Sequence, residues 1–249
     1  MLTEERKSII LNAVERDGSA SVRELMELLD TSESTIRRDI SELDRKGLLI
    51  RVHGGAVAKN GPVITADASV AERSALMLEE KRRIARYAAG LIVNEDVVFL
   101  DAGTTTGLML DYLPMQGEHV VYVTDAPQLA IRLSELNQEV YLPGGLMKKE
   151  TEIVVGADTC RYLGRFHFTK AFFGVNGARP KEGFTTPERA EALVKETVFR
   201  HSRERYVLAD SSKFEVISSV TFGDWESARI LTDAGVGSVY RAYENVVVV

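Results

Sequence analysis

The sequence predicts two domains, a small helical domain with a β-hairpin at the N-terminus and a larger α/β domain built on a largely parallel sheet. Residues 1–57 carry apolar side chains at helical spacing and end in a glycine-centred hairpin. Residues 58–79 are weakly periodic and suit a linker. From residue 80 to residue 249 short apolar runs alternate with helix-like stretches, which is typical of an α/β domain.

The composition is that of an ordinary globular protein and excludes a disordered chain or a membrane protein. The 249 residues are 45% hydrophobic and 27% charged. No apolar run approaches the roughly 18 residues that a spanning helix needs, and the opening MLTEERKSII does not have the pattern of a signal peptide. A single cysteine, Cys160, has no internal disulfide partner and favours a reducing cytoplasm. We expect no metal site and no cofactor, because the four histidines lie far apart in the sequence, at positions 53, 119, 167 and 201.

The first 57 residues predict three helices and a hairpin. The first helix runs from about Glu4 to Glu15 and is stopped by Gly18. Ser21 is a suitable N-cap for the second helix. The third helix runs from about Glu33 to Lys46, and a left-handed C-cap is expected at the glycine that follows. The hairpin, LLIRVHGGAVA, folds about the glycine pair 54–55.

A short turn between the second helix and a basic third helix predicts a helix-turn-helix that binds DNA. The net charge of −6 argues against this, but residues 37–59 hold six Lys or Arg against three Asp or Glu, a net of +3. Short hydroxyl side chains and adjacent arginines point outward from the third helix and suit contacts to phosphates and base edges. These outward positions are Ser34, Thr35, Arg37 and Arg38. The alternative is a helical packing module with a solvated charged face.

The run SESTIRRDISELDRKGLLIRVHGGA, residues 32–56, resembles the DeoR family of bacterial transcription regulators. That family carries a winged helix-turn-helix with TIRRDL in its recognition helix and RxHGGA in its wing. The present sequence departs only at Ile40, which replaces the leucine. The resemblance extends over nearly all of the chain. It implies that the residues in contact with operator DNA are Ser34, Thr35, Arg37, Arg38, Arg51, His53, Gly54 and Gly55.

Six strand-like runs are expected in the second domain, with polar loops after them. The runs cover residues 96–101, 120–125, 139–144, 170–175, 205–210 and 228–233. The first is followed by AGTTTG, a glycine- and hydroxyl-rich junction before a helix-like stretch, which suits an anion. Five further segments are expected to be loops at the same edge, TDAPQ (124–128) with the segments 143–145, 174–177, 183–195 and 209–214. Lys195 and Lys213 lie in these segments and are natural phosphate partners, although each alone is more often a solvated surface residue.

The resemblance gives these loops roles. The second domain of the family looks like the ribose-5-phosphate isomerase, glucosamine-phosphate isomerase and CoA transferase fold, and it binds phosphorylated sugars. Carried over by motif, the phosphate lies against Gly103, Thr104, Thr105, Thr106 and Lys213. The sugar end is lined by Asp101, Thr124, Gly144, Gly145, Asn176, Glu191 and Lys195.

Two other functions compete with that of a sensor. A sugar-phosphate isomerase needs a carboxylate base, and residues 174–177 contain none, although Glu188 and Glu191 remain as candidates. The attached DNA-binding module favours a regulator that is not an enzyme. A purely architectural DNA-binding protein would leave the large second domain without a role.

The resemblance extends to the fructose-operon repressors of the family, on the segments GFTTPERAEALVKE, GVNG and YLPGGLMKKET. It implies a repressor that fructose 1-phosphate releases from its operator. Tagatose, galactitol and glycerol phosphates remain alternative effectors. Because helix-turn-helix proteins usually bind paired half-sites, we expect a homo-oligomer, a dimer or a tetramer.

Overall fold

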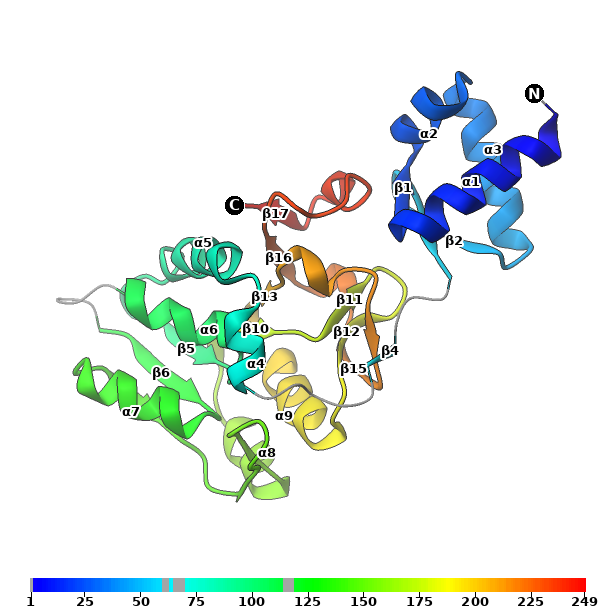
Figure 1. The fold of residues 1–249 in the computed structure, drawn as a ribbon. Helices are drawn as coiled ribbons and strands as arrows, with labels where there is room; N and C mark the ends of the chain where they lie inside the picture. The colour runs from blue at the N-terminus through cyan, green and yellow to red at the C-terminus, as the bar shows by residue number, and fades with distance from the viewer. Residues whose placement is uncertain (1, 60–62, 65–69, 114–118) are drawn as a thin grey trace.

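The computed structural model describes residues 2–59, 63–64, 70–113 and 119–249. Figure 1 shows the N-terminal helices in blue at one end of the molecule and the α/β domain in the rest of it. Both predicted architectures are confirmed. Among the described residues, no helix is long and apolar enough to cross a membrane.

The N-terminal part is a helix-turn-helix with a β-wing. Its three helices pack beside a three-stranded antiparallel sheet in the order β1-β3-β2. In chain order the elements are α1 (Thr3–Asp17), β1 (Ser19–Ser21), α2 (Val22–Leu29), α3 (Glu33–Arg45), β2 (Leu49–Val52) and β3 (Gly55–Ala58).

Local sequence signals account for the ends of these helices. Gly47 follows α3 with a φ of 67°, the left-handed conformation predicted for it, and Gly18, predicted to stop α1, follows that helix with a φ of 77°. Ser21 accepts a hydrogen bond from the backbone N–H of Glu24, and the Glu24 carboxylate accepts one from the Ser21 N–H, which completes a capping box on α2.

A buried ion pair fixes α3 on α1. Asp39 is buried, and its carboxylate accepts hydrogen bonds from Arg6 on α1 at 2.5 and 3.2 Å. Ile36 and Ile40 on the same face of α3 pack into the core against Ile10. The opposite face of α3 is therefore held outward.

The second part is built on a seven-stranded sheet in the order β17-β16-β13-β10-β5-β6-β7. Every neighbouring pair in this sheet is parallel. All six predicted strands are present. They are β5 (Val97–Leu100), β6 (Val121–Thr124), β7 (Glu139–Tyr141), β10 (Phe168–Gly174), β13 (Ser202–Leu208) and β16 (Arg229–Thr232), and the seventh strand, β17 (Val246–Val248), was not predicted.

Both faces of the sheet are buried, as parallel sheets require. On β10, Phe172 packs into the core on one face, and Ala171 and Phe173 pack into the core on the other. The first core lies under α5 (Leu78–Ala89), α6 (Thr104–Leu108), the 3-10 helix η1 (Met109–Tyr112) and α7 (Pro127–Glu135). The second lies under α8 (Ala157–Leu163) and α9 (Arg189–Arg200). The domain is a three-layer α/β/α sandwich (Figure 1).

The prediction that residues 183–195 form a loop is wrong. Residues Gly183–Thr186 form strand β12, which is buried along its length in a small antiparallel sheet with β11 (Gly177–Arg179) and β15 (Val220–Gly223). The remainder begins α9, after Pro187. The sequence of this segment carries turn-forming residues, but tertiary pairing with β15, distant in the chain, selects the strand.

The segment predicted as a linker contains regular structure and touches the second domain. Strand β4 (Val63–Ile64) pairs in parallel with β14 (Ile217–Ser218), and a short helix, α4 (Val70–Ala75), follows. At the start of the segment the buried Arg179 donates a hydrogen bond to the carbonyl of Ala58 at 2.5 Å.

The winged part also contacts the C-terminal region directly. The backbone N–H of His53 in the wing donates to the hydroxyl of Tyr243 at 2.9 Å, and Ser238 donates to Glu24 on α2 at 2.8 Å. Val239 packs against the backbone of Gly55.

Candidate functional site

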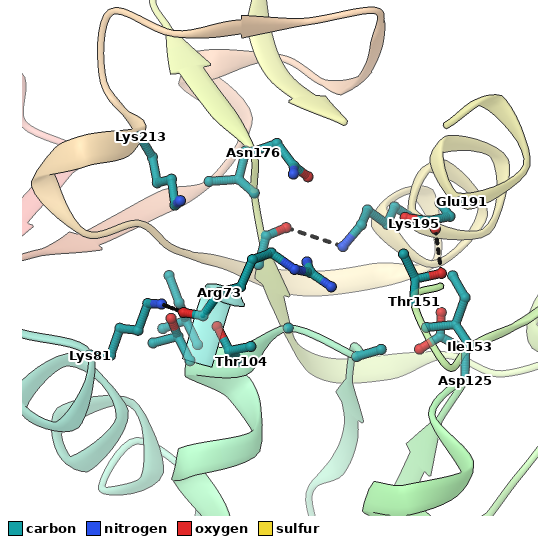
Figure 2. Close-up of a pocket in the computed structure, with 16 residues that line it drawn as sticks. Arg73, Lys81, Thr104, Asp125, Thr151, Ile153, Asn176, Glu191, Lys195 and Lys213 are labelled. Atoms are coloured by element: carbon teal, nitrogen blue, oxygen red, sulfur yellow. Dashed lines mark hydrogen bonds between the residues drawn. The ribbon is translucent and has the colours of Figure 1, made fainter. Parts of the chain in front are cut away.

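A polar pocket opens where four neighbouring parallel strands end (Figure 2). It lies at the carboxyl edge of β13, β10, β5 and β6, the edge where ligands bind in parallel α/β sheets. Seven of the predicted residues line it, namely Gly103, Thr104, Thr105, Asn176, Glu191, Lys195 and Lys213.

A buried aspartate lies within two residues of the end of each of four strands. Three of them, Asp101, Asp210 and Asp233, accept hydrogen bonds from backbone N–H groups of the loops that follow. The fourth, Asp125 after β6, differs. It is only 3% exposed, it lines the pocket, and its Oδ1 has no hydrogen-bond partner among the described residues.

Asp101 connects three segments of the pocket wall. Its carboxylate accepts from the N–H of Gly103 at 2.9 Å and from the N–H of Gly174 at 2.7 Å. It also pairs with the ammonium of Lys195 on α9, which donates a second hydrogen bond to the carbonyl of Gly174 at 3.1 Å. Burial acts to lower the pKa of Lys195, but the charge and hydrogen bond of Asp101, together with the charges of Asp125 and Glu191, outweigh it, so this pKa is raised and Lys195 is held as a cation.

The opposite end of the pocket is basic. In Figure 2, Lys81 and Lys213 approach from the same side as Thr104. Lys81 is buried, and its pKa is lowered by burial and by the nearby charges of Lys213 and Arg73. Lys213 has no ion-pair partner within the described ranges, and its loop is fixed because Asp233 accepts a hydrogen bond from the N–H of Ser211 at 2.6 Å.

Some predicted residues lie outside this pocket. Asp101 lies behind the wall, and Thr106 is buried with its hydroxyl donating to Asp101 at 2.9 Å. Thr124 is fully buried, and its hydroxyl accepts from the N–H of Ala126. Gly144 and Gly145 lie beside α8, where the carbonyl of Gly144 accepts from Thr159 at 2.9 Å. These positions correct the expectation that Thr106 holds the phosphate and that the other four line the sugar end, because their polar groups are bonded within the protein wall.

Nine lining residues were not predicted as site residues. Four of them, Ala102, Gly174, Val175 and Leu208, lie at the strand ends and loops already described, and five others remain. Arg73, Lys81, Asp125, Thr151 and Ile153 reach the pocket from α4, α5, the end of β6 and the turn between β8 (Leu146–Met147) and β9 (Val154–Val155). Asp125 alone carried a usable signal, because it ends a strand in the same way as Asp101. The others approach from segments whose sequence shows no polar cluster.

The outward face of α3 is the candidate DNA-binding surface. Ser34, Arg37 and Arg38 are exposed, and Thr35 is partly exposed. Arg37 pairs with Glu33 one turn earlier at 2.7 Å. Arg38 has no ion-pair partner in the part of the chain that is described, so its guanidinium is available to a ligand.

The predicted wing residues divide into two kinds. Arg51 is exposed and donates a hydrogen bond to Ser41 on α3 at 3.0 Å, which joins the wing to the outward face of α3. His53 is exposed beside Tyr243. Gly54 is partly exposed, but Gly55 is buried, and a Cβ there would lie 2.2 Å from the carbonyl oxygen of Ala20. The position of Gly55 therefore corrects the expectation of DNA contact, since this glycine permits close backbone packing.

Comparison with known families identifies both parts. The DeoR C-terminal sensor domain matches residues 77–234, and the DeoR-like helix-turn-helix domain matches residues 6–61. The chain belongs to the DeoR family. The resemblance inferred from residues 32–56 is thereby confirmed, and this DeoR-family protein is a helix-turn-helix transcription regulator with a C-terminal sensor domain.

Individual relatives agree with the family. The chain is 36% identical over 249 residues to the HTH-type transcriptional regulator FruR of Bacillus subtilis, which covers 100% of this chain and 98% of the relative. It is 35% identical to the lactose phosphotransferase system repressor of Staphylococcus epidermidis, over 84% of this chain and 83% of that one. Among solved structures, ribose 5-phosphate isomerase A from Neisseria gonorrhoeae aligns with a TM-score of 0.40 at 15% identity, over 54% of this chain and 52% of that chain.

The Asp125 carboxyl makes the stability of this DeoR-family protein depend on pH. Burial, with the Asp101 charge second, raises the pKa of Asp125 from 3.8 to about 7. Folding therefore favours the protonated form, and the stability present below pH 3.8 is lost as the pH rises through about 7. Asp125→Asn cannot ionise, so we expect it to be more stable than the unmodified protein at pH 8, by about 4 kcal/mol at most.

Thermal unfolding of both proteins between pH 5 and pH 8 measures this difference. The gap in melting temperature should widen as the pH rises. A gap that stays constant over this range would contradict the raised pKa.

Proposed function

We propose that this protein is a cytoplasmic repressor of a sugar-catabolism operon, and that a phosphorylated sugar, with fructose 1-phosphate favoured, releases it from operator DNA. Residues 1–57 bind the operator, residues 58–79 link the domains, and residues 80–249 sense the sugar. The observation that carries the proposal is the polarity of the pocket, which is cationic around Lys81 and Lys213 and rich in hydrogen-bonding side chains around Asp125 and Glu191.

The cationic end suits a phosphate group. A phosphate monoester carries close to two negative charges near neutrality and binds best to charge-assisted donors. The pKa of Lys81 is lowered mainly by burial and further by the charges of Lys213 and Arg73, and an anion bound among these cations stabilises the charged form of Lys81. Lys213 and the hydroxyl of Thr104 supply further donors on the same side of the pocket (Figure 2).

The other end suits the hydroxyl groups of a sugar. Asp125 is buried with an oxygen that lacks a partner among the described residues, and such a group gains a hydrogen bond when a hydroxyl reaches it. Glu191 already accepts from Thr151 at 2.7 Å, and Asn176 accepts from Thr186 at 3.2 Å, so both side chains are oriented. Oriented acceptors of this kind favour a polyhydroxyl ligand over a bare anion.

The proposal includes that the protein is a sensor and not an isomerase. Of the two candidate bases that the sequence offers, Glu191 lines the pocket, and its bond to Thr151 holds it in place. Glu188 pairs with Lys148 at 2.8 Å, which engages the second candidate base. The fructose assignment is supported by the sequence segments shared with fructose-operon repressors, and the lactose-system relative shows why other phosphosugars belong in the test.

Operator recognition rests on the exposed face of α3 and on a homo-oligomer, at least a dimer, that presents two copies of it to paired half-sites. We expect Arg38→Ala to weaken operator binding by about 1–3 kcal/mol if Arg38 reads a base. Arg37→Ala should also weaken it, with a flatter salt dependence if Arg37 contacts phosphate.

Fluorescence anisotropy on a duplex selected from a random library, at two salt concentrations, measures both effects. Arg161→Ala is the matched control, because Arg161 is an exposed, ion-paired arginine on α8 of the other domain. Unchanged affinity in both α3 variants would remove the recognition-helix assignment.

Fructose 1-phosphate should raise the melting temperature and release the duplex, and free fructose should do neither. The stabilisation should grow with concentration as RT ln(1 + [L]/Kd). Lys213→Ala should abolish the response and leave DNA affinity without ligand intact, whereas Lys149→Ala, an exposed lysine outside the pocket, should respond normally.

A thermal-shift panel of C1- and C6-phosphorylated hexoses, with tagatose, galactitol and glycerol phosphates added, checks the class of effector. A response to free sugar, or to none of the phosphates, would refute the sensor assignment. A stronger response to another phosphosugar would overturn only the assignment of fructose 1-phosphate as the effector. Isomerase turnover that disappears in Glu191→Gln would favour the enzyme alternative.

A further inference from the structure

The linker itself enters the pocket. Arg73 lies on the short helix α4, within the segment that joins the two domains, and it lines the pocket with Lys81, Lys195 and Lys213. Figure 2 shows its side chain extending across the middle of the pocket. Lys81 and Lys213 lie on one side of it, and Lys195, Glu191 and Thr151 lie on the other. Its backbone carbonyl accepts a hydrogen bond from the ammonium of Lys81, which fixes α4 against α5.

The Arg73 side chain occupies the space that a ligand needs. With it in place the cavity encloses about 50 Å³. An apolar cavity of about 150 Å³ holds a molecule of benzene, and a hexose phosphate is more than twice that size in heavy atoms. A phosphosugar is larger than this cavity, so the lining has to move to admit it, and Arg73 is the lining residue that crosses the middle of the pocket.

The displaced guanidinium has one favourable place to go. Moving it away from the pocket would separate a cation from an anionic ligand, whereas turning it onto the ligand gives a planar, charge-assisted contact to phosphate. Because Arg73 is attached to a helix of only six residues, its rearrangement is expected to move the helix. Strand β4 precedes α4 in the chain, and its pairing with β14 holds the linker near the loop that carries Lys213. The wing in turn precedes β4, so the linker connects this region to the DNA-binding domain.

We propose that Arg73 is a ligand-binding residue supplied by the linker, and that its contact with the phosphorylated sugar is the step that carries pocket occupancy to the DNA-binding domain. This inference rests on the proposed function, since it assumes an anionic sugar as the ligand. It adds that the linker is part of the site, so ligand binding and linker position are coupled.

Three measurements on Arg73→Ala test it, with fructose 1-phosphate as the probe. Loss of a charge-assisted contact should weaken its affinity by about tenfold to a hundredfold in calorimetric titration. At ligand concentrations that saturate the variant, hydrogen exchange should slow in the loop 102–106 but no longer in residues 72–76, which slow in the unmodified protein. The ratio of DNA affinities without and with ligand should fall at least about fivefold.

Two variants complete the design. Arg82→Ala removes an exposed arginine of α5 that pairs with Glu79 outside the pocket, and it should behave as the unmodified protein does. Arg73→Lys keeps the charge but not the planar fork, and it should give an intermediate affinity. If the alanine variant folds poorly, Arg73→Lys can be used for the same three measurements.

The outcomes separate the two proposals. If the unmodified protein does not respond to any phosphosugar in the panel, the proposed function fails. If it responds and depends on Lys213, but Arg73→Ala binds fructose 1-phosphate with unchanged or higher affinity, only the role of Arg73 is overturned. Weakened binding with full protection of residues 72–76 and full DNA release would overturn the coupling step.

Discussion

The buried carboxylate of Asp101 is the constraint on which the sensor site depends. A buried charge is stable only when it is paired and hydrogen-bonded, and the partners of Asp101 come from three segments: the loop after β5, the end of β10 and helix α9. Each partner is thereby fixed relative to the other two. Lys195 is held at the pocket wall by this requirement, and Gly103 and Gly174 approach closely enough that a side chain on either would collide.

The DNA-binding part uses the same device on a smaller scale. Asp39 on α3 is buried and paired with Arg6 of α1. Because this pairing holds the Asp39 face of α3 against α1, the opposite face, which carries Arg37 and Arg38, points outward. In both parts an aspartate whose own side chain is inaccessible determines where accessible cations lie. The residues proposed to recognise ligands are thus positioned by buried aspartates that are not themselves proposed to contact the ligands.

The periodicity of the sequence predicted those elements of the fold that depend on residues close together in the chain. The three N-terminal helices, their glycine ends and the six apolar strands follow from spacing and turn residues that act within a few positions. Residues 183–186 were mistaken for loop because their strand is selected by β15, far along the chain. β17 was missed although its valines favour a strand. Among the predicted site residues, Thr106 and Gly145 were assigned by resemblance to the family motif, which does not reveal whether a polar group faces a pocket or the backbone. Arg73 was beyond prediction, since only tertiary packing brings the linker to the sheet edge.

The pairing of β4 with β14 has a consequence for the newly made chain. The core of the winged part draws only on residues between positions 9 and 58, so this part can complete its own packing soon after it leaves the ribosome. The partners that hold it and its linker, namely β14, Ser238 and Tyr243, are all translated near the other end of the chain. During synthesis the DNA-binding surface is therefore expected to fold before the contacts with the sensor domain can form. Because the chain is made from its N-terminus, the DNA-binding part can fold before the sensor domain that contacts it has been completed.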